Sequence, residues 1–251
     1  MDLGLTDKRV LVTGSGRGIG LAIAKVLHQE GCYVALNARH ETEIANIAAN
    51  WVERVSFHVA DVTQPEQCQL LIDAVERKWG GIDLLVCNVG SGASVLPGQE
   101  TPEEWQRVIN LNLFATTNMV ETARKLLVAS GGAIVCISSI CGLETLGAPV
   151  TYSAAKAALN SYVKGIARPL AKQGIRINAI APGNILAEGG TWSRKLQENP
   201  TGVQTMLERE VALQRLGKPE EIANFAAFLL STKASFATGA IYVVDGGQIR
   251  G

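Results

Sequence analysis

Runs of apolar residues long enough for strands alternate along this chain with amphipathic segments long enough for helices. The apolar runs predict seven strands, at residues 9–13, 32–37, 54–59, 82–87, 133–138, 175–180 and 241–244. Helical periodicity predicts helices between them, at residues 19–30, 41–51, 65–79, 101–128, 151–172 and 217–230. Because the strand runs are continuously apolar rather than alternating, they indicate a parallel sheet buried on both faces. We therefore predict an α/β fold, a single doubly wound domain over residues 1–251 with helices on both faces of a seven-stranded parallel sheet.

The composition fits one globular domain and excludes several other classes of protein. Hydrophobic residues make up 47% of the 251 residues and charged residues 18%, which excludes disorder and suggests that copies of the chain cover one another. The 23 basic and 23 acidic residues give a formal net charge of +0, so no nucleic-acid partner is expected. The longest uncharged run, residues 126–143, contains glycines and serines and predicts no membrane span.

The N-terminal residues and the cysteines favour a cytoplasmic protein. The chain becomes strand-like by Arg9, which leaves no room for a signal peptide. The five cysteines include no C-x-x-C pair and three lie in apolar strand runs, so buried free thiols are expected. His28, His40 and His58 have no ligand spacing, and no metal site is predicted.

A glycine cluster between the first strand and the first helix is the candidate site for a dinucleotide. Gly14, Gly18 and Gly20 would let the backbone approach a pyrophosphate, which a helix N-terminus attracts. The spacing G-x-x-x-G-x-G differs from the G-x-G-x-x-G fingerprint, and no lysine follows as in a P-loop. A tight turn without a ligand is the alternative. The position after the first strand of a βαβ unit favours the ligand and a Rossmann domain.

The end of the second strand predicts a preference for NADP(H). NAD-selective folds place an acid there, about 20 residues past the glycines, to hold the ribose hydroxyls. This chain has Asn37-Ala38-Arg39-His40 and no acid before Glu41. Arg39, with Arg17 in the glycine turn, could pair with a 2′-phosphate. Two solvated surface arginines are the alternative.

A phenol, an ammonium and a hydroxyl form the candidate catalytic group. Tyr152 and Lys156 lie at i and i+4, one turn apart on a predicted helix. Ser138-Ser139 end the strand just upstream, so a serine hydroxyl is expected to share the crevice with Tyr152. The Y-x-x-x-K pair alone is weak evidence, because chance produces it readily in a chain with several tyrosines and lysines.

Taken together, these motifs resemble the short-chain dehydrogenase/reductase family over almost the whole chain. The glycine pattern, Ser139 thirteen residues before Tyr152, and Lys156 carry the resemblance. Further similar segments are Asp61-Val62, Cys87-Asn88-Val89-Gly90, Asn110-Leu111-Asn112-Leu113, Pro182-Gly183, residues 215–223 and Val244-Asp245-Gly246-Gly247. Cys87, Val89 and Ala187 depart from the family pattern.

The resemblance implies hydride transfer between a nicotinamide and a carbonyl or alcohol carbon. It implies that Tyr152 is the acid or base, that Lys156 and the nicotinamide charge lower its pKa, and that Ser139 binds the substrate oxygen. Asn112, the fourth implied catalytic residue, would hold a water that links Lys156 to solvent. The implied cofactor-binding residues are Gly14, Ser15, Arg17, Gly18, Ile19, Gly20, Arg39, Asp61, Val62, Asn88, Val89, Gly90, Tyr152, Lys156, Pro182, Gly183 and Ile185.

The substrate cannot be read directly from the residues. The family resemblance implies a mobile lid at about 184–205, a segment without a strong helical period, and a pocket lined also by residues 91–94. We expect NADP(H)-dependent reduction of a 3-oxoacyl-type carbonyl, with NAD(H) as the alternative cofactor. A sugar or polyol dehydrogenase is the alternative function, and a non-catalytic dinucleotide-sensing protein the remote one. A homotetramer, or at least a dimer, is expected. The low charged fraction and the small residues on the Tyr152 helix, Ala154, Ala155, Ala157 and Ala158, suit close contact between subunits, and the resemblance implies a D2 arrangement.

Overall fold

The computed structural model describes residues 2–42, 51 and 53–250, which fold around one parallel sheet. Its seven strands lie in the order β3-β2-β1-β4-β5-β6-β7, and every neighbouring pair is parallel. The strands are β1 (Arg9–Val12), β2 (Tyr33–Ala38), β3 (Val55–Val59), β4 (Leu84–Cys87), β5 (Ala133–Ile137), β6 (Arg176–Pro182) and β7 (Ile241–Val244). The predicted seven-stranded parallel sheet is confirmed.

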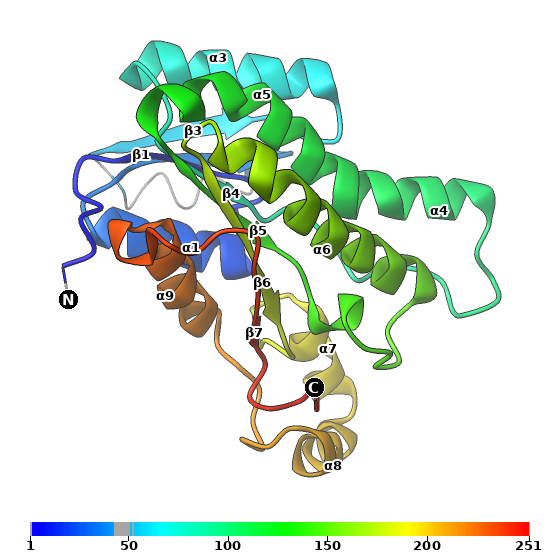
Figure 1. The fold of residues 1–251 in the computed structure, drawn as a ribbon. Coiled ribbons are helices and arrows are strands. Elements are labelled where there is room, and N and C mark those ends of the chain that lie inside the picture. The colour runs from blue at the N-terminus through cyan, green and yellow to red at the C-terminus, as the bar shows by residue number, and fades with distance from the viewer. Residues whose placement is uncertain (1, 43–50, 52, 251) are drawn as a thin grey trace.

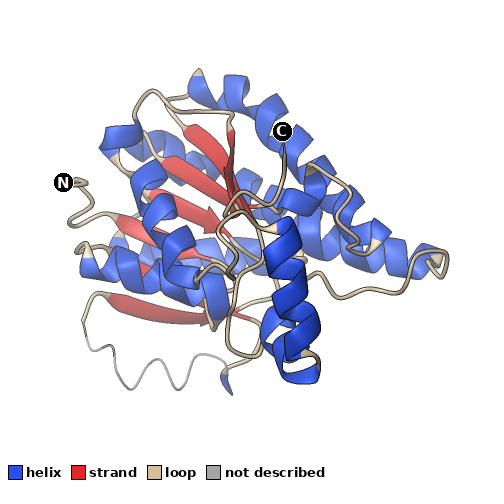
Figure 2. Cartoon of the chain, turned by 90° about the horizontal axis from the view of Figure 1, so that it is seen from below, coloured by secondary structure: helices blue, strands red, loops and turns tan. Residues whose placement is uncertain are grey.

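Helices cover both faces of the sheet, as Figures 1 and 2 show. On one face α1 (Gly18–Gln29) packs against α9 (Pro219–Leu230). The other face is covered by α3 (Pro65–Trp79), α5 (Ala115–Ser130) and α6 (Val150–Ala171). Short 3-10 turns lie at Ile140–Gly142 and Thr232–Ala234. None of the described helices is long and apolar enough to cross a bilayer.

The sheet separates two hydrophobic cores. Along β1, Leu11 packs into the core beneath α3, α5 and α6, whereas Val10 and Val12 pack into the core beneath α1 and α9. All three side chains are fully buried. Burial of an aliphatic side chain of this size contributes about 1.5–3 kcal/mol. The continuous apolar runs of the sequence therefore arise because both faces of each central strand are covered.

Residues 101–128, predicted as one helix, form α4 (Pro102–Ile109), a π-helical turn at Asn110–Phe114, and α5. The Asn112 side-chain amide donates to the carbonyl of Val108 at 3.1 Å. A regular α-helix would use that carbonyl for the backbone N–H of residue 112, so the side chain competes with the ladder and the turn widens.

The segment after β6 also differs from its prediction. It forms α7 (Thr191–Glu198) and α8 (Pro200–Glu210), so the helical region extends beyond residue 205. Each helix contributes only two or three apolar residues to a small separate core around Val203, Leu207 and Val211, which explains the weak helical period. Most of the helix predicted at 41–51 lies outside the described residues.

The topology places the candidate site. Strand order reverses between β1 and β4, whose following segments diverge to opposite faces of the sheet. In open α/β sheets, ligands bind in the crevice at the carboxyl ends of the strands at such a point. The glycine turn follows β1, and the segment carrying Asn88 and Gly90 follows β4.

Candidate active site

The glycine turn is bonded to both neighbouring strands. The Asn88 amide donates to the carbonyls of Thr13 and Gly14 at 3.2 and 2.9 Å, and the Ser15 hydroxyl accepts from Asn37 N at 2.9 Å. Gly14 has a φ of +60°, which favours glycine. A Cβ on Gly20 would lie 2.5 Å from the Gly14 carbonyl oxygen, so the first turn of α1 requires a glycine there.

This turn fits a dinucleotide pyrophosphate. Arg17 is the N-cap residue of α1, and its side chain makes no capping hydrogen bond to the first N–H groups of the helix. Such a helix start attracts anionic groups through its N–H donors and its dipole. Ile19 lies in this first turn and packs against the core beneath α1.

Two arginines lie exposed at the edge of the crevice. Arg39 directly follows the last residue of β2, and Arg17 lies in the glycine turn. A Cβ on Gly189, in the segment before α7, would lie 3.9 Å from Nη1 of Arg17. Within the described residues, neither arginine forms an ion pair. As far as the described residues go, both guanidinium groups are therefore available for an anion.

The remaining predicted cofactor residues lie at the ends of β3, β4 and β6. Asp61 uses its carboxylate to accept from the backbone N–H and hydroxyl of Thr63, while Val62 is buried. The side chain of Val89 lies against Gly14. Pro182 ends β6, Gly183 packs closely on Asp245, and Ile185 forms an isolated bridge with Gly217.

The four candidate catalytic residues come from three elements. Ser139 follows β5, Asn112 lies in the π-helical turn, and Tyr152 and Lys156 lie in the first two turns of α6. Gly90 lies where two of them converge, because a Cβ there would be 2.8 Å from Asn112 Oδ1 and 3.1 Å from Lys156 Nζ. The structure thus brings together residues that are far apart in the sequence.

Burial dominates the acid–base properties of the Tyr152–Lys156 pair. It raises the pKa of Tyr152 to about 12, although a hydrogen bond with Ser139 acts in the opposite direction. It lowers the pKa of Lys156, which is 3% exposed, to about 8. The Lys156 ammonium is 5.9 Å from the centre of the Tyr152 ring and donates to the Ile137 carbonyl at 2.8 Å.

The expected lowering of the Tyr152 pKa by Lys156 is therefore not found in the protein alone. The phenol is a neutral acid at neutral pH, able to give a proton to a substrate oxygen. The pKa of Lys156 is close enough to neutral to mildly alkaline pH for its ammonium to exchange a proton there.

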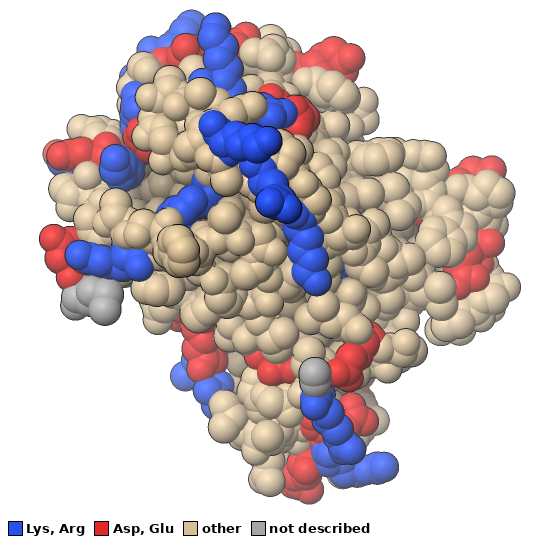
Figure 3. Space-filling model, in the orientation of Figure 1, with Lys and Arg blue, Asp and Glu red and all other residues tan. Residues whose placement is uncertain are grey.

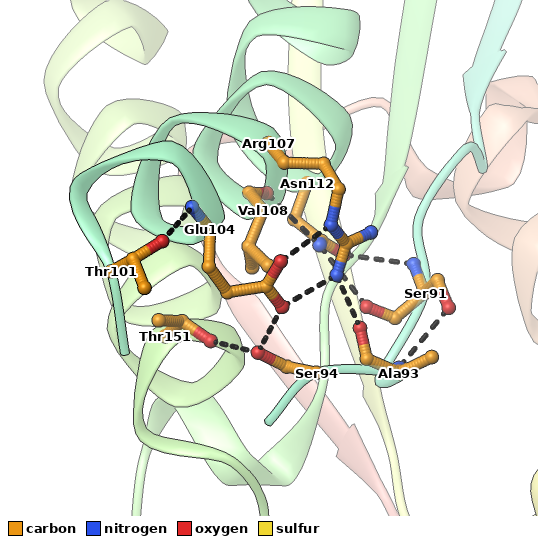
Figure 4. Close-up of polar contacts among 9 residues, drawn as sticks. All are labelled: Ser91, Ala93, Ser94, Thr101, Glu104, Arg107, Val108, Asn112 and Thr151. Carbon is orange, nitrogen blue, oxygen red and sulfur yellow. Dashed lines mark hydrogen bonds and ion pairs between the residues drawn. The ribbon is translucent and has the colours of Figure 1, made fainter. Parts of the chain in front are cut away.

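Sequence reasoning missed the hydrogen bonds that fix the segment after β4. Glu104 and Arg107 of α4 bond to that segment, and Thr151 of α6 bonds to its Ser94 (Figure 4). The only sequence signal for these bonds was the i,i+3 spacing of Glu104 and Arg107. In the sequence, acidic residues at this position indicated only the start of a helix. Gly92 does lie beside Tyr152, but the Ser91 and Ser94 hydroxyls are already bonded within the protein.

The cysteines are free thiols, as predicted. Cys32, Cys68, Cys87 and Cys136 are buried and Cys141 is half-buried. Cys87 faces Cys136 across the β4–β5 pair, and a hydrogen bond with that thiol, together with burial, raises the pKa of Cys87. The departure at Cys87 thus places an uncharged thiol in the core. Among the described residues no cluster could hold a metal ion.

Comparison with known proteins establishes the family. Residues 14–248 match the family model described as enoyl-(acyl carrier protein) reductase. The chain is 32% identical to a 3-oxoacyl-(acyl-carrier-protein) reductase of Rickettsia felis, over 98% of each chain. It is 35% identical to glucose 1-dehydrogenase 2 of Bacillus subtilis, over 97% of this chain and 95% of the relative. The protein belongs to the short-chain dehydrogenase/reductase family.

Solved structures of this family agree with the fold. L-sorbose reductase from Gluconobacter frateurii, complexed with NADPH and L-sorbose, superposes with a TM-score of 0.93 at 33% identity and full coverage of both chains. A short-chain dehydrogenase/reductase from Caenorhabditis elegans with cofactor gives a TM-score of 0.89 at 31% identity, covering 97% of this chain and 96% of the other. As a member of this family, the protein is an NAD(P)-dependent oxidoreductase.

The buried Lys156 ammonium should lower the stability of the fold. Folding lowers its pKa from 10.5 to about 8, so at pH 7 the charged form is less favourable in the folded chain than in the unfolded chain. Lys156→Met should therefore raise the free energy of unfolding at pH 7, by at most about 3 kcal/mol, since one pKa unit corresponds to about 1.4 kcal/mol. Urea denaturation measures the difference.

The same cost of burying Lys156 should make the stability difference between wild type and Lys156→Met depend on pH. Between the folded and unfolded pKa values the unfolded chain binds more protons, so the wild type gains stability with rising pH and the advantage of Lys156→Met should shrink. Lys164→Met, at an exposed position of the same helix, is the control. A wild type more stable than Lys156→Met at pH 7 would contradict the assigned cost of burial.

Proposed function

We propose that this protein reduces a carbonyl group of a small molecule to a secondary alcohol, with NADP(H) as cofactor. The observation that carries the proposal is a neutral, half-buried phenol, Tyr152, beside Ser139 and Lys156 at the carboxyl edge of the sheet. When bound, the nicotinamide would supply the hydride. The chain's own residues supply the orientation of the carbonyl and the proton.

Tyr152 and Ser139 act on the substrate oxygen in this proposal. Both hydroxyls donate hydrogen bonds to the carbonyl oxygen, which favours the charge that develops there. The Tyr152 Oη proton then moves to that oxygen. In the alcohol-to-carbonyl direction the phenol would have to lose its proton first, which its raised pKa disfavours in the protein alone.

Lys156 and Asn112 support the proton donor. The Lys156 ammonium has three N–H donors, and the Ile137 carbonyl is its one hydrogen-bond acceptor among the described residues. The other donors can bind a ribose hydroxyl and stabilise the phenolate. Asn112 holds the backbone N–H and C=O of Ser91 at 3.0 and 3.1 Å, so its side chain fixes the segment above Lys156. The water-holding role expected for Asn112 stays a prediction.

The cofactor is proposed to lie along the carboxyl edge. Gly14, Ser15, Gly18, Ile19 and Gly20 would hold the pyrophosphate, with the other cofactor residues on either side. Asp61 and Val62 would contact the adenine, and Asn88, Val89, Gly90, Tyr152, Lys156, Pro182, Gly183 and Ile185 the nicotinamide half. We propose that the segment from residue 184 through α7 and α8 covers the substrate as a lid.

The first substrate class that we propose is a 3-oxoacyl thioester. The similarity to 3-oxoacyl-(acyl-carrier-protein) reductases over nearly the whole chain supports it. A sugar or polyol is the second candidate, because L-sorbose reductase and glucose 1-dehydrogenase 2 are comparably similar. The assembly that we propose is a homotetramer in the cytoplasm. Its Tyr152 helix presents Ala157 to solvent and Ala154 and Ala158 at half-buried positions, whereas Ala155 is buried within the subunit.

NADPH oxidation with a panel of carbonyl compounds tests the reaction and the substrate. We expect 3-oxoacyl thioesters to give the highest kcat/KM, ahead of ketoses and simple ketones. Turnover of ketoses alone would assign the second candidate, and cofactor binding without turnover of any compound would favour a dinucleotide sensor. Tyr152→Phe keeps the ring but removes the acid, so kcat should fall about 10²–10⁴-fold with cofactor affinity retained. Near-normal kcat in that variant would refute the role of Tyr152.

Cofactor preference should follow the arginines at the edge of the crevice. Charge-assisted bonds to a phosphate contribute about 1.5–3 kcal/mol, and about 1.4 kcal/mol corresponds to a factor of ten, so NADPH should be preferred more than tenfold. Arg39→Asp should move the preference toward NADH, mainly through the KM of the cofactor. Arg168→Asp, on the exposed side of α6, is the matched control. Equal use of both cofactors by the wild type would show that Arg17 and Arg39 are surface residues only.

Light scattering at micromolar concentration tests the assembly. The expected mass is four times the 26.6 kDa of one chain. Two features support association: large areas without charged side chains in Figure 3, and exposed apolar residues, Phe228 of α9 and Val243 of the edge strand β7. A mass of one chain would contradict the proposal.

A further inference from the structure

The segment between β4 and α4 lies across the candidate catalytic residues. Gly90 lies against Asn112 and Lys156, and a Cβ on Gly92 would be 3.8 Å from Cε1 of Tyr152. Residues 88–96 contain neither helix nor strand, so no ladder of backbone hydrogen bonds fixes them. Their position depends on bonds to neighbouring elements.

Those bonds come from α4, the π-helical turn and α6, as Figure 4 shows. Asn112 bonds to both backbone groups of Ser91. Arg107 Nη2 donates to the Ala93 carbonyl at 2.9 Å. The Ser94 hydroxyl lies 2.7 Å from Glu104 Oε1 and 2.7 Å from the Thr151 hydroxyl. The segment is therefore attached at three residues, Ser91, Ala93 and Ser94.

Glu104 is the centre of this network. Arg107 Nε donates to its Oε2, and Arg107 Nη2 to its Oε1, both at 2.7 Å. The hydrogen bonds from Arg107 and then Ser94 lower the pKa of Glu104 to about 2. An ionised carboxylate only accepts hydrogen bonds, so Ser94 must use its single proton to bond Glu104. Thr151 is consequently the donor to Ser94, and the chain of donors runs from Thr151 to Ser94 to Glu104.

Thr151 connects this chain to the proton donor. It is fully buried, lies in the first turn of α6, and directly precedes Tyr152. The N-cap of α6, Pro149, provides no side-chain hydrogen bond to the helix start. The bond from Thr151 to Ser94 thus ties the first turn of α6 to the segment above the active site.

We propose that Glu104 is a positioning residue for Tyr152, holding through Ser94 both the first turn of α6 and the segment that covers the phenol. Its effect falls on the chemical step, because the bonds of this network are made at Ser91, Ala93 and Ser94, beyond residues 88–90, which are proposed to contact the nicotinamide. The glycine turn and Arg39, proposed to bind the phosphates of the cofactor, lie outside the network. The inference rests on the proposed carbonyl reduction, because that reaction supplies the kinetic readout.

Glu104→Gln is the first test. The amide keeps the length of the side chain but cannot accept from Arg107 and Ser94 as a charged carboxylate does. We expect kcat to fall about tenfold or more, because small misplacements of reacting groups are costly, while the KM for NADPH stays within about twofold. The matched control is Glu121→Gln, which breaks another i,i+3 pair, Glu121–Arg124, at 3.1 Å on α5. That control should leave kcat unchanged.

Thr151 provides a second test that does not depend on the ion pair. Thr151→Val removes the hydroxyl at nearly constant shape and should lower kcat as Glu104→Gln does, whereas Thr151→Ser should restore most of it. The double variant Glu104→Gln with Thr151→Val should be little worse than either single variant, because both break the same chain. Thermal melts show which variants are folded. If Glu104→Gln does not fold, the comparison of Thr151→Val with Thr151→Ser tests the inference instead.

Two outcomes would overturn the inference. One is kcat within about twofold of the wild type in both Glu104→Gln and Thr151→Val. The other is a loss that falls on the KM for NADPH or is equal in Glu121→Gln. If the wild type turns over no carbonyl, the proposed function fails, and amide hydrogen exchange still decides the inference. Exchange at the hydrogen-bonded amides of Ser91 and Ala93, and at the α6 amides from Ser153 through the second turn, should be faster in Glu104→Gln than in Glu121→Gln, and equal exchange would refute it.

Discussion

The pairing of β1 with β4 is the contact on which the arrangement of the site depends. These strands are distant in sequence but adjacent in the sheet, and the chain leaves them toward opposite faces. The Asn88 amide links the two diverging segments by donating to the carbonyls of Thr13 and Gly14, directly after β1. The glycine turn and the segment over Tyr152 therefore share one support, and a shift of β4 would displace both.

One of the proposed catalytic side chains, Lys156, also opposes folding. Lys156 is almost fully buried, with one carbonyl acceptor among the described residues, and its lowered pKa measures the loss of hydration. Tyr152 is neutral at neutral pH in both the folded and the unfolded chain, so its raised pKa carries no such cost there. The strong packing of the two cores on either side of the sheet offsets the cost at Lys156, because each central strand is covered on both faces.

The sequence allowed the sheet and the main site to be predicted for physical reasons. Continuous apolar runs reflect burial on both faces, and in that context the glycines and the Tyr152–Lys156 spacing are typical of a dinucleotide-dependent site. It did not reveal the π-helical turn, because that depends on where the Asn112 amide points. Helices α7 and α8 were missed because each has few apolar residues. The Glu104 network was missed because Ser94 and Thr151, 57 positions apart, meet only in the folded chain.

The small core shared by α7 and α8 has a mechanical consequence. Trp192 and Leu196 pack with Val203 and Leu207 rather than with either sheet-facing core. Two glycines precede α7, and Gly189 has a φ of +64°, a conformation open to glycine at low energy. Movement of this helix pair, as the proposed lid requires, would therefore leave the packing of both sheet-facing cores unchanged. In the proposed lid, covering the crevice is thus separated from the stability of the sheet.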